Sequence, residues 1–156
     1  PYIMRKAAER GLFIAFNASP IPGVENYPLE FVCWLFINEI EGAALSGETE
    51  PKAILRALRE KYPRTQVILT LGGDGSYWDD GRETVFCPAC HVQAVDTTAA
   101  GDTFTGFFLR GVLGEDCGLA PLTLATCASG IAVTRPGAAP SVPTLAEVLA
   151  SPIRPE

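Results

Sequence analysis

One stretch of the sequence, residues 95–104, combines acidic, hydroxyl and small side chains in an order that suits chemistry on a phosphoryl group. Asp96 ends a short apolar run, two threonines and three small residues follow, and Asp102 then opens a segment with helical periodicity. Small residues let backbone approach a ligand closely, and the first amides of a helix have no partner within it, so together they form an anion site. An ionised Asp102 beside that site could accept the proton of an attacking hydroxyl.

A plainer explanation exists for the same stretch. Thr98 could be the N-cap of the helix, and Asp102 a carboxylate that the helix dipole favours. For an isolated aspartate in a first helical turn this explanation would be preferred. Only the whole string Asp-Thr-Thr-Ala-Ala-Gly-Asp, which ends at Asp102, favours a site.

Two further segments carry residues that could hold a nucleotide or a metal ion. The segment 70–75, Thr-Leu-Gly-Gly-Asp-Gly, follows a predicted strand. Its glycines allow backbone to lie against a base, ribose or phosphate, and a plain hairpin turn is the alternative. It is neither a Walker A loop nor a dinucleotide fingerprint. Asn38 and Glu41 stand where a strand passes into a helix, and their oxygens suit Mg²⁺, although acidic residues are also common at helix starts.

Helix and strand patterns alternate along the chain and would position these residues. Short apolar runs predict buried strands at residues 12–16, 33–37, 66–71 and 91–95, with a hairpin of 76–78 and 84–86 around Asp80-Gly81. Helices are expected at residues 2–10, 38–45, 50–62, 98–113, 119–133 and 144–149. The alternation predicts a mostly parallel sheet covered by helices, in a single domain over residues 1–156.

Composition restricts the classes of partner. The formal net charge is -6 and no basic tract is present, which argues against nucleic acid and anionic membranes as partners. The most apolar run, residues 31–37, is far shorter than the roughly 18 residues that span a bilayer. The first residues show no signal-peptide pattern, and five cysteines form no even framework, so a cytoplasmic protein is expected.

The string that ends at Asp102 resembles the signature of the ribokinase/PfkB family of carbohydrate kinases, and the other two segments match that family in the same order. In the family, the Ala-Gly-Asp backbone forms the anion hole and the final Asp is the catalytic base. The resemblance therefore implies catalytic roles for Ala100, Gly101 and Asp102, and a Mg²⁺-organising role for Asn38 and Glu41. The nucleotide-binding positions that it implies are Asn38, Thr70, Leu71, Gly72, Gly73, Asp74, Gly75, Gly101 and Thr126.

The segment 131–141 resembles the family's loop that holds a monovalent cation beside the anion hole, although a surface loop rich in Pro and Gly is the plain alternative. Most ligands in such a loop are main-chain oxygens, so side-chain identity matters little. The cation ligands implied are Asp96, Thr98, Ala132, Arg135, Gly137 and Ser141. The resemblance thus implies ATP, Mg²⁺ and K⁺ at the site.

The resemblance runs from about Leu12 to Val148 and corresponds to the C-terminal half of such a kinase. The loop Asn17-Ala-Ser-Pro20 is compatible with it, whereas the family's N-terminal Gly-Gly sugar motif and β lid have no counterpart. It implies a three-layer α/β/α, ribokinase-like fold and ATP-dependent phosphorylation of a primary hydroxyl of a small sugar, with ribose preferred.

Three interpretations remain at this point, and a ribokinase is the first of them. Another kinase of the superfamily, such as a fructokinase, a nucleoside kinase or a hydroxymethylpyrimidine kinase, would share the same motifs. A truncated, catalytically silent nucleotide-binding module would share them too. Family members often form homodimers through the lid, so a homodimer of the full-length protein stays open.

The string Cys87-Pro-Ala-Cys90-His91 spells the pattern of c-type haem attachment. Haem attachment needs export, and with His91 the only histidine and Met4 the only methionine, axial ligands are scarce. A zinc site needs two more ligands, and the remaining cysteines offer no second C-x-x-C. These cysteines are therefore predicted to be packing residues, with a disulfide formed under stress as the lesser alternative.

Overall fold

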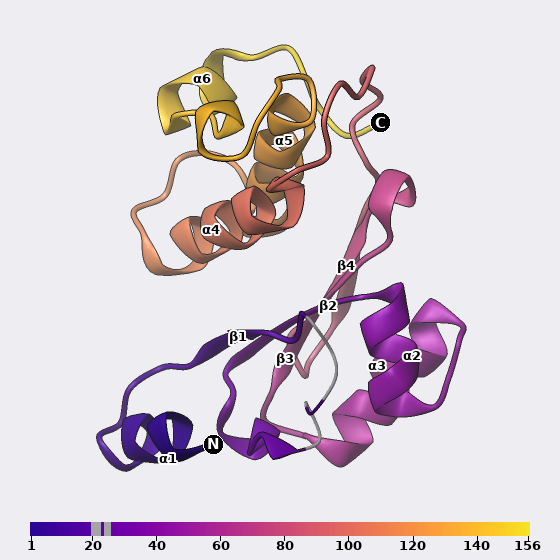
Figure 1. Cartoon of the computed structure of the whole chain (residues 1–156), viewed down its shortest axis with the longest axis vertical. Helices are drawn as coiled ribbons and strands as arrows, with labels where there is room; N and C mark the ends of the chain where they lie inside the picture. The colour runs from indigo at the N-terminus through magenta and orange to yellow at the C-terminus, as the bar shows by residue number, and fades with distance from the viewer. Residues whose placement is uncertain (20–22, 24–25) are drawn as a thin grey trace. The chain divides into compact units, whose positions relative to one another are not determined.

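The computed structural model describes residues 1–19, 23 and 26–156 (Figure 1). They form two compact units: Pro1–Leu71 with Tyr77–Phe86, and Gly72–Ser76 with Cys87–Glu156. Pro20, at the end of the loop that resembles the family's, lies outside the described residues. The single domain over residues 1–156 stays a prediction.

Three parallel strands form the centre of the first unit. They are β1 (Ala15–Asn17), β2 (Trp34–Asn38) and β3 (Gln66–Thr70). Ala15 pairs with Trp34, and Trp34 in turn pairs with Gln66 on the other side. The side chains of β2 and β3 are mostly buried, as their continuous apolar runs predict. Because the strands are parallel, Asn38 and Thr70 end side by side at one edge of the sheet.

The predicted hairpin is confirmed and extends the sheet, whose order is β1-β2-β3-β4-β5. Its strands are β4 (Ser76–Asp79) and β5 (Thr84–Cys87). The turn is held by the Asp80 carboxylate, which accepts hydrogen bonds from the amides of Arg82 (2.7 Å) and Glu83 (2.9 Å). The Trp78 indole N–H also donates to Gln66 (3.0 Å), which joins β4 to β3 through side chains.

Helices pack against this sheet within the first unit. They are α1 (Tyr2–Glu9), the short 3₁₀ turn η2 (Leu29–Phe31), α2 (Glu39–Ser46) and α3 (Pro51–Lys61). Ile54, Leu55 and Leu58 line the buried face of α3, close to the predicted amphipathic pattern. The helices α2 and α3 touch at Gly42, where an added Cβ would lie 2.9 Å from Ile54 Cγ2. The first core is therefore a layer of aliphatic side chains between these helices and β2 and β3.

The second unit is mainly helical. Its elements are η3 (Gly72–Asp74), α4 (Ala100–Leu113), α5 (Pro121–Ala132), η4 (Ala139–Ser141) and α6 (Leu145–Ala150). The helices α4 and α5 lie side by side (Figure 1), and α5 is buried along almost its whole length. Leu124, Ile131 and Val148 are among the residues of this second core. Within the described ranges, no helix has both the length and the apolar character needed to cross a bilayer.

Two predicted strands differ from the structure. The first begins at Ala15 rather than at residue 12, and Leu12 and Phe13 are 59% and 75% exposed, because pairing with β2 starts only at Ala15. The strand predicted at residues 91–95 is wrong. Among the described residues, no strand pairs with that segment. The Val95 amide instead donates to the carbonyl oxygen of Val133 (2.7 Å), just after α5.

The start of α6 makes a prediction about acid stability. Thr144 and Glu147 form a capping box, and the Arg135 guanidinium lies 2.8 Å from Glu147 Oε1. The Thr144 amide, then its hydroxyl and then Arg135 lower the pKa of Glu147 from 4.5 to about 2. Because the folded pKa lies below the unfolded one, the stabilisation is complete above pH 4.5 and is lost as the pH falls toward 2.

We therefore expect Glu147→Gln to lower the melting temperature at pH 6 but to have little effect at pH 2. Thermal unfolding followed by circular dichroism at both pH values measures the difference. A melting-temperature difference that is the same at both pH values would contradict the assignment.

Candidate active site

The segment that leads into α4 is fastened to the end of α5. The amides of Val95 (2.7 Å) and Asp96 (3.2 Å) both donate to the carbonyl oxygen of Val133. The Ser129 hydroxyl, one turn earlier on α5, donates to the carbonyl oxygen of Ala100 (3.1 Å). The beginning of α4 is therefore positioned by α5 rather than by a strand.

The N-terminus of α4 has no side-chain cap. Its N-cap residue is Ala99, not Thr98, and no side chain there accepts a hydrogen bond from the first helical amides. Ala99 has a φ of +60°, the only positive φ at a non-glycine residue in the described chain. Such a conformation is uncommon and costs energy, which is typical of functional turns. The plainer explanation, an ordinary helix start capped by Thr98, is therefore wrong.

The open end of α4 presents backbone donors. The Ala100 amide donates to the carbonyl oxygen of Thr97 (3.2 Å). The amides of Gly101 and Asp102 have no protein acceptor among the residues described here. An added Cβ on Gly101 would meet nothing within 4 Å, so the approach to this backbone is open. Free amides at the positive end of a helix dipole are suited to an anion.

Asp102 lies at the same helix end and is exposed to solvent. A carboxylate at this helix end can act as a proton acceptor. The next residue, Thr103, is buried, and its hydroxyl has no partner among the described residues. Sequence reasoning missed this hydroxyl, although it lies directly after the motif and could have been included with it.

Asp96 joins the turn before α4 to the loop after α5. Its Oδ1 accepts from the Thr98 amide (2.8 Å) and its Oδ2 from the Gly137 amide (2.9 Å). The Thr98 hydroxyl, followed by the two amides, lowers the pKa of Asp96 below its ordinary value. Three of the six residues that the resemblance implies as cation ligands are thus in direct contact.

The other three implied cation ligands have partners of their own. The carbonyl oxygen of Ala132 accepts from the Arg135 amide (3.0 Å), and the Arg135 guanidinium pairs with Glu147. Ser141 is fully buried, and its hydroxyl donates to the carbonyl oxygen of Ala138 (2.7 Å). Carboxylate and carbonyl oxygens are the donors that a hard cation takes, so the residue types fit K⁺. Their assignment as ligands stays a prediction.

Asn38 and Glu41, in the first unit, form a capping box. The Glu41 amide donates to Asn38 Oδ1 and the Asn38 amide to Glu41 Oε2, both at 2.9 Å. The two residues therefore cap the start of α2, as the simpler explanation for this pair predicts. Glu41 is only 5% exposed, and its Oε1 has no donor among the described residues. That oxygen fits a Mg²⁺-bound water, which keeps the metal role as a prediction.

The glycine-rich segment after β3 is a 3₁₀ turn rather than a plain hairpin turn. The Thr70 hydroxyl donates to the carbonyl oxygen of Ile37 (3.4 Å), and Leu71 is buried. Gly75 packs against protein, because an added Cβ would lie 2.3 Å from the carbonyl oxygen of Cys87. Gly72, Gly73 and Asp74 are exposed. A nucleotide could therefore reach these three exposed residues, but not Gly75.

Thr126, the remaining predicted nucleotide position, lies on α5. It is 7% exposed, and its hydroxyl donates to the carbonyl oxygen of Leu122 (2.9 Å) within the helix. Its own carbonyl oxygen accepts from the Cys90 thiol (3.7 Å). The Thr126 side chain is thus engaged by protein, and a contact with adenine stays a prediction.

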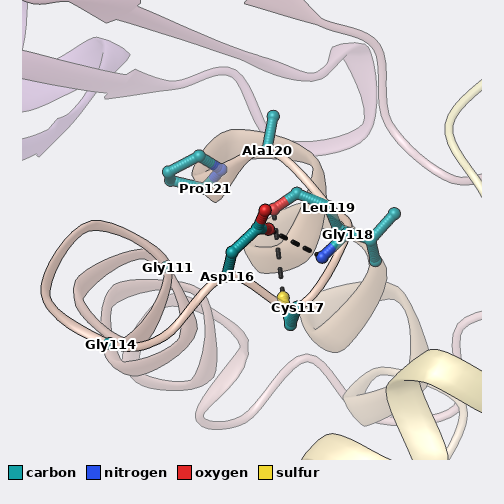
Figure 2. A pocket seen from close by; sticks show the side chains of 8 residues that line it. All are labelled: Gly111, Gly114, Asp116, Cys117, Gly118, Leu119, Ala120 and Pro121. Carbon is teal, nitrogen blue, oxygen red and sulfur yellow. Dashed lines mark hydrogen bonds between the residues drawn. The ribbon is translucent and has the colours of Figure 1, made fainter.

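Two hollows formed by described residues contain none of the predicted site residues. A pocket of about 430 Å³ lies at the turn between α4 and α5. Figure 2 shows that its polar groups bond within that turn, where Asp116 accepts from the Gly118 amide (2.8 Å) and Cys117 donates to Leu119 (3.9 Å). A hollow of about 690 Å³ lies between α3 and the β4–β5 hairpin and contains the Arg59–Asp79 ion pair. Neither shares a residue with the start of α4.

Comparison with known proteins relates this arrangement to one family. A family model described as pfkB family carbohydrate kinase matches residues 15–145. The ribokinase of Schizosaccharomyces pombe is 34% identical over 151 residues, which cover 91% of this chain and 47% of that protein. The chain spans about half the length of the curated relatives it matches.

Solved structures show the same likeness. The crystal structure of ribokinase from Thermotoga maritima matches with a TM-score of 0.78 and 34% identity, covering 93% of this chain and 50% of that one. Arabidopsis thaliana ribokinase, complexed with ribose and ATP, matches with a TM-score of 0.81 and 29% identity, covering 94% and 49%. The predicted three-layer α/β/α, ribokinase-like fold is confirmed.

Proposed function

Because the chain belongs to the PfkB family of carbohydrate kinases, we propose that it supplies the phosphoryl-transfer residues of an ATP-dependent sugar kinase. The acceptor is a primary hydroxyl of a small sugar, and ribose is the first candidate. The observation that carries this proposal is the uncapped N-terminus of α4, where Asp102 is exposed beside free backbone amides.

Each group at this helix end has a role in the proposed reaction. Asp102 accepts the proton of the sugar hydroxyl as that hydroxyl attacks. The amides of Gly101 and Asp102, at the positive end of the α4 dipole, stabilise the negative charge on the transferring group. The Ala100 amide contributes less, because it already donates to Thr97.

Ribose is the first candidate for the acceptor because the related proteins include ribokinases. The Schizosaccharomyces pombe relative is a ribokinase, and the Arabidopsis thaliana structure holds ribose and ATP. Both likenesses cover about half of those proteins. We therefore propose both the preference for ribose and the use of ATP as the phosphoryl donor.

Two cations complete the proposal. Asn38 and Glu41 would hold Mg²⁺ through water, and the ion would neutralise phosphate charge. Asp96 and the loop that contains Gly137 would hold K⁺, which would help to order the turn before α4. Asp96 already fastens that turn to the loop through its two carboxylate oxygens, so a cation there reinforces an existing connection.

The setting in the cell is part of the same proposal. Five free cysteines suit a reducing compartment, and the use of ATP suits the cytoplasm. The net charge of -6 argues against nucleic acid and anionic membranes as partners. A homodimer is supported by the family resemblance alone.

ADP release by the natural protein that carries this chain tests the function. With Mg²⁺ and K⁺ present, we expect ribose-dependent ADP release that exceeds release with fructose, a nucleoside or hydroxymethylpyrimidine. Replacing K⁺ with Na⁺ should slow turnover several-fold, and chelating Mg²⁺ should stop it. Preference for another acceptor would overturn ribose, and ATP binding without turnover on any acceptor would favour the silent module.

A further inference from the structure

Two cysteines that are distant in sequence lie together in the second unit. Cys90 is on the segment between β5 and α4, and Cys127 is on α5. Both side chains pack in the same apolar cluster of the second core, and the Cys90 thiol lies 3.7 Å from the carbonyl oxygen of Thr126. An added Cβ on Gly130 would be 3.0 Å from Cys90 Cβ and 3.3 Å from its Sγ. Cys90 therefore rests directly on the turn of α5 that carries Cys127.

A third group activates this pair. The Arg154 guanidinium donates to the carbonyl oxygens of Ile153 (2.7 Å) and Leu149 (3.2 Å), which holds it beside Cys127. The neighbouring Cys90 thiol, and then Arg154, lower the pKa of Cys127 to about 7 in spite of burial. The hydrogen bond to Cys127, and then burial, raise the pKa of Cys90. These contacts therefore favour the thiolate at Cys127 and the protonated thiol at Cys90.

The surroundings distinguish this pair from the other cysteines. Cys127 is fully buried, whereas Cys90 is partly exposed and gives small reagents access. Cys87, the other member of the C-x-x-C string, directs its thiol to the carbonyl oxygen of Pro88 (3.6 Å). In the part of the chain that the structure describes, no group of three His, Cys, Asp or Glu residues could hold a metal ion. The chemistry that we consider for Cys90 and Cys127 is therefore oxidation of their thiols.

We propose that Cys90 and Cys127 are a redox-active pair that forms a reversible disulfide with a hydroperoxide as the oxidant. The Cys127 thiolate takes the proton of the Cys90 thiol as the exposed Cys90 sulfur attacks the peroxide, which breaks the O–O bond. With hydrogen peroxide, this step gives a sulfenic acid on Cys90 and releases hydroxide. The Cys127 sulfur then attacks Cys90, forms the S–S bond and releases water. A small dithiol reverses the reaction by exchange.

Mass spectrometry of the oxidised natural protein tests the pairing without any mutation. After brief treatment with hydrogen peroxide, free thiols are alkylated and the digested protein is searched for linked peptides. We expect peptides joined through Cys90 and Cys127 that separate on reduction. A Cys87–Cys90 linkage, or Cys90 oxidised beyond the sulfenic acid while Cys127 is alkylated, would overturn the proposal.

Variants provide matched controls. Cys117→Ser and Cys87→Ser should leave the Cys90–Cys127 linkage in place, whereas Cys90→Ser should remove it. In Arg154→Gln, the midpoint of the pH dependence of the peroxide reaction should move upward, because the Cys127 thiolate loses its cation. An unchanged midpoint in a folded Arg154→Gln protein would contradict the role of Arg154 and that of Cys127 as the proton acceptor.

Discussion

Asp102→Asn, made in the natural protein that carries this chain, is expected to lower kcat by about 10²–10⁴-fold while ATP affinity changes little. Asparagine has nearly the same size and keeps a polar group in the first turn of α4, but it cannot accept the proton of a sugar hydroxyl. ADP release under saturating substrate measures kcat, and calorimetric titration with a non-hydrolysable ATP analogue measures affinity.

Asp116→Asn is the matched control for this experiment. Asp116 is also an exposed aspartate of the second unit, but it lies in the turn after α4, where it accepts from the Gly118 amide (2.8 Å). Its replacement should leave kcat unchanged. Turnover near the wild-type level in Asp102→Asn would remove the base assignment, whereas equal losses in both variants would indicate a general effect of charge.

Gly75→Ala is expected to destabilise the fold by about 3 kcal/mol or more. An alanine Cβ would lie 2.3 Å from the carbonyl oxygen of Cys87 and 2.8 Å from Pro88 Cα, both of which are backbone atoms that cannot move alone. The φ of Gly75 is +123°, a conformation that side chains disfavour. Urea unfolding followed by tryptophan fluorescence measures the change in free energy.

Gly73→Ala is the control in the same turn. Gly73 is exposed, and an added Cβ would meet nothing within 4 Å, so stability should change by less than about 0.5 kcal/mol. Loss of ATP-analogue binding in Gly73→Ala at unchanged stability would support this turn as the nucleotide loop. Equal destabilisation by both substitutions would contradict the packing argument for Gly75.

Much of the fold could be predicted from local patterns. The strands β2 and β3 are continuous apolar runs, and α3 has an amphipathic sequence that Pro63 follows, so periodicity alone locates them. The hairpin at Asp80-Gly81 could be predicted for a similar reason, because its turn is built from local side-chain and backbone bonds. Elements that depend on their own residues are the ones that sequence reasoning predicts well.

Elements that depend on distant partners could not be predicted in this way. Residues 91–95 have the composition of a strand, but only a neighbouring strand would make them one, and the structure gives Val95 a helix-end carbonyl instead. The contact between Cys90 and Cys127 joins residues that are far apart in the chain, and no local pattern signals it. The positive φ of Ala99 could not be predicted either, because alanine by itself disfavours a left-handed backbone conformation.

The short first strand has a consequence for how this chain behaves at high concentration. β1 is at one edge of the described sheet, and the two residues that precede Ile14 are large, apolar and exposed. Tyr2 and Ile3 of α1 are also exposed, at 71% and 80%. Unpaired strand edges next to exposed apolar side chains promote self-association. Overexpression of this chain by itself should therefore favour inclusion bodies, and purification should benefit from low concentration and mild detergent.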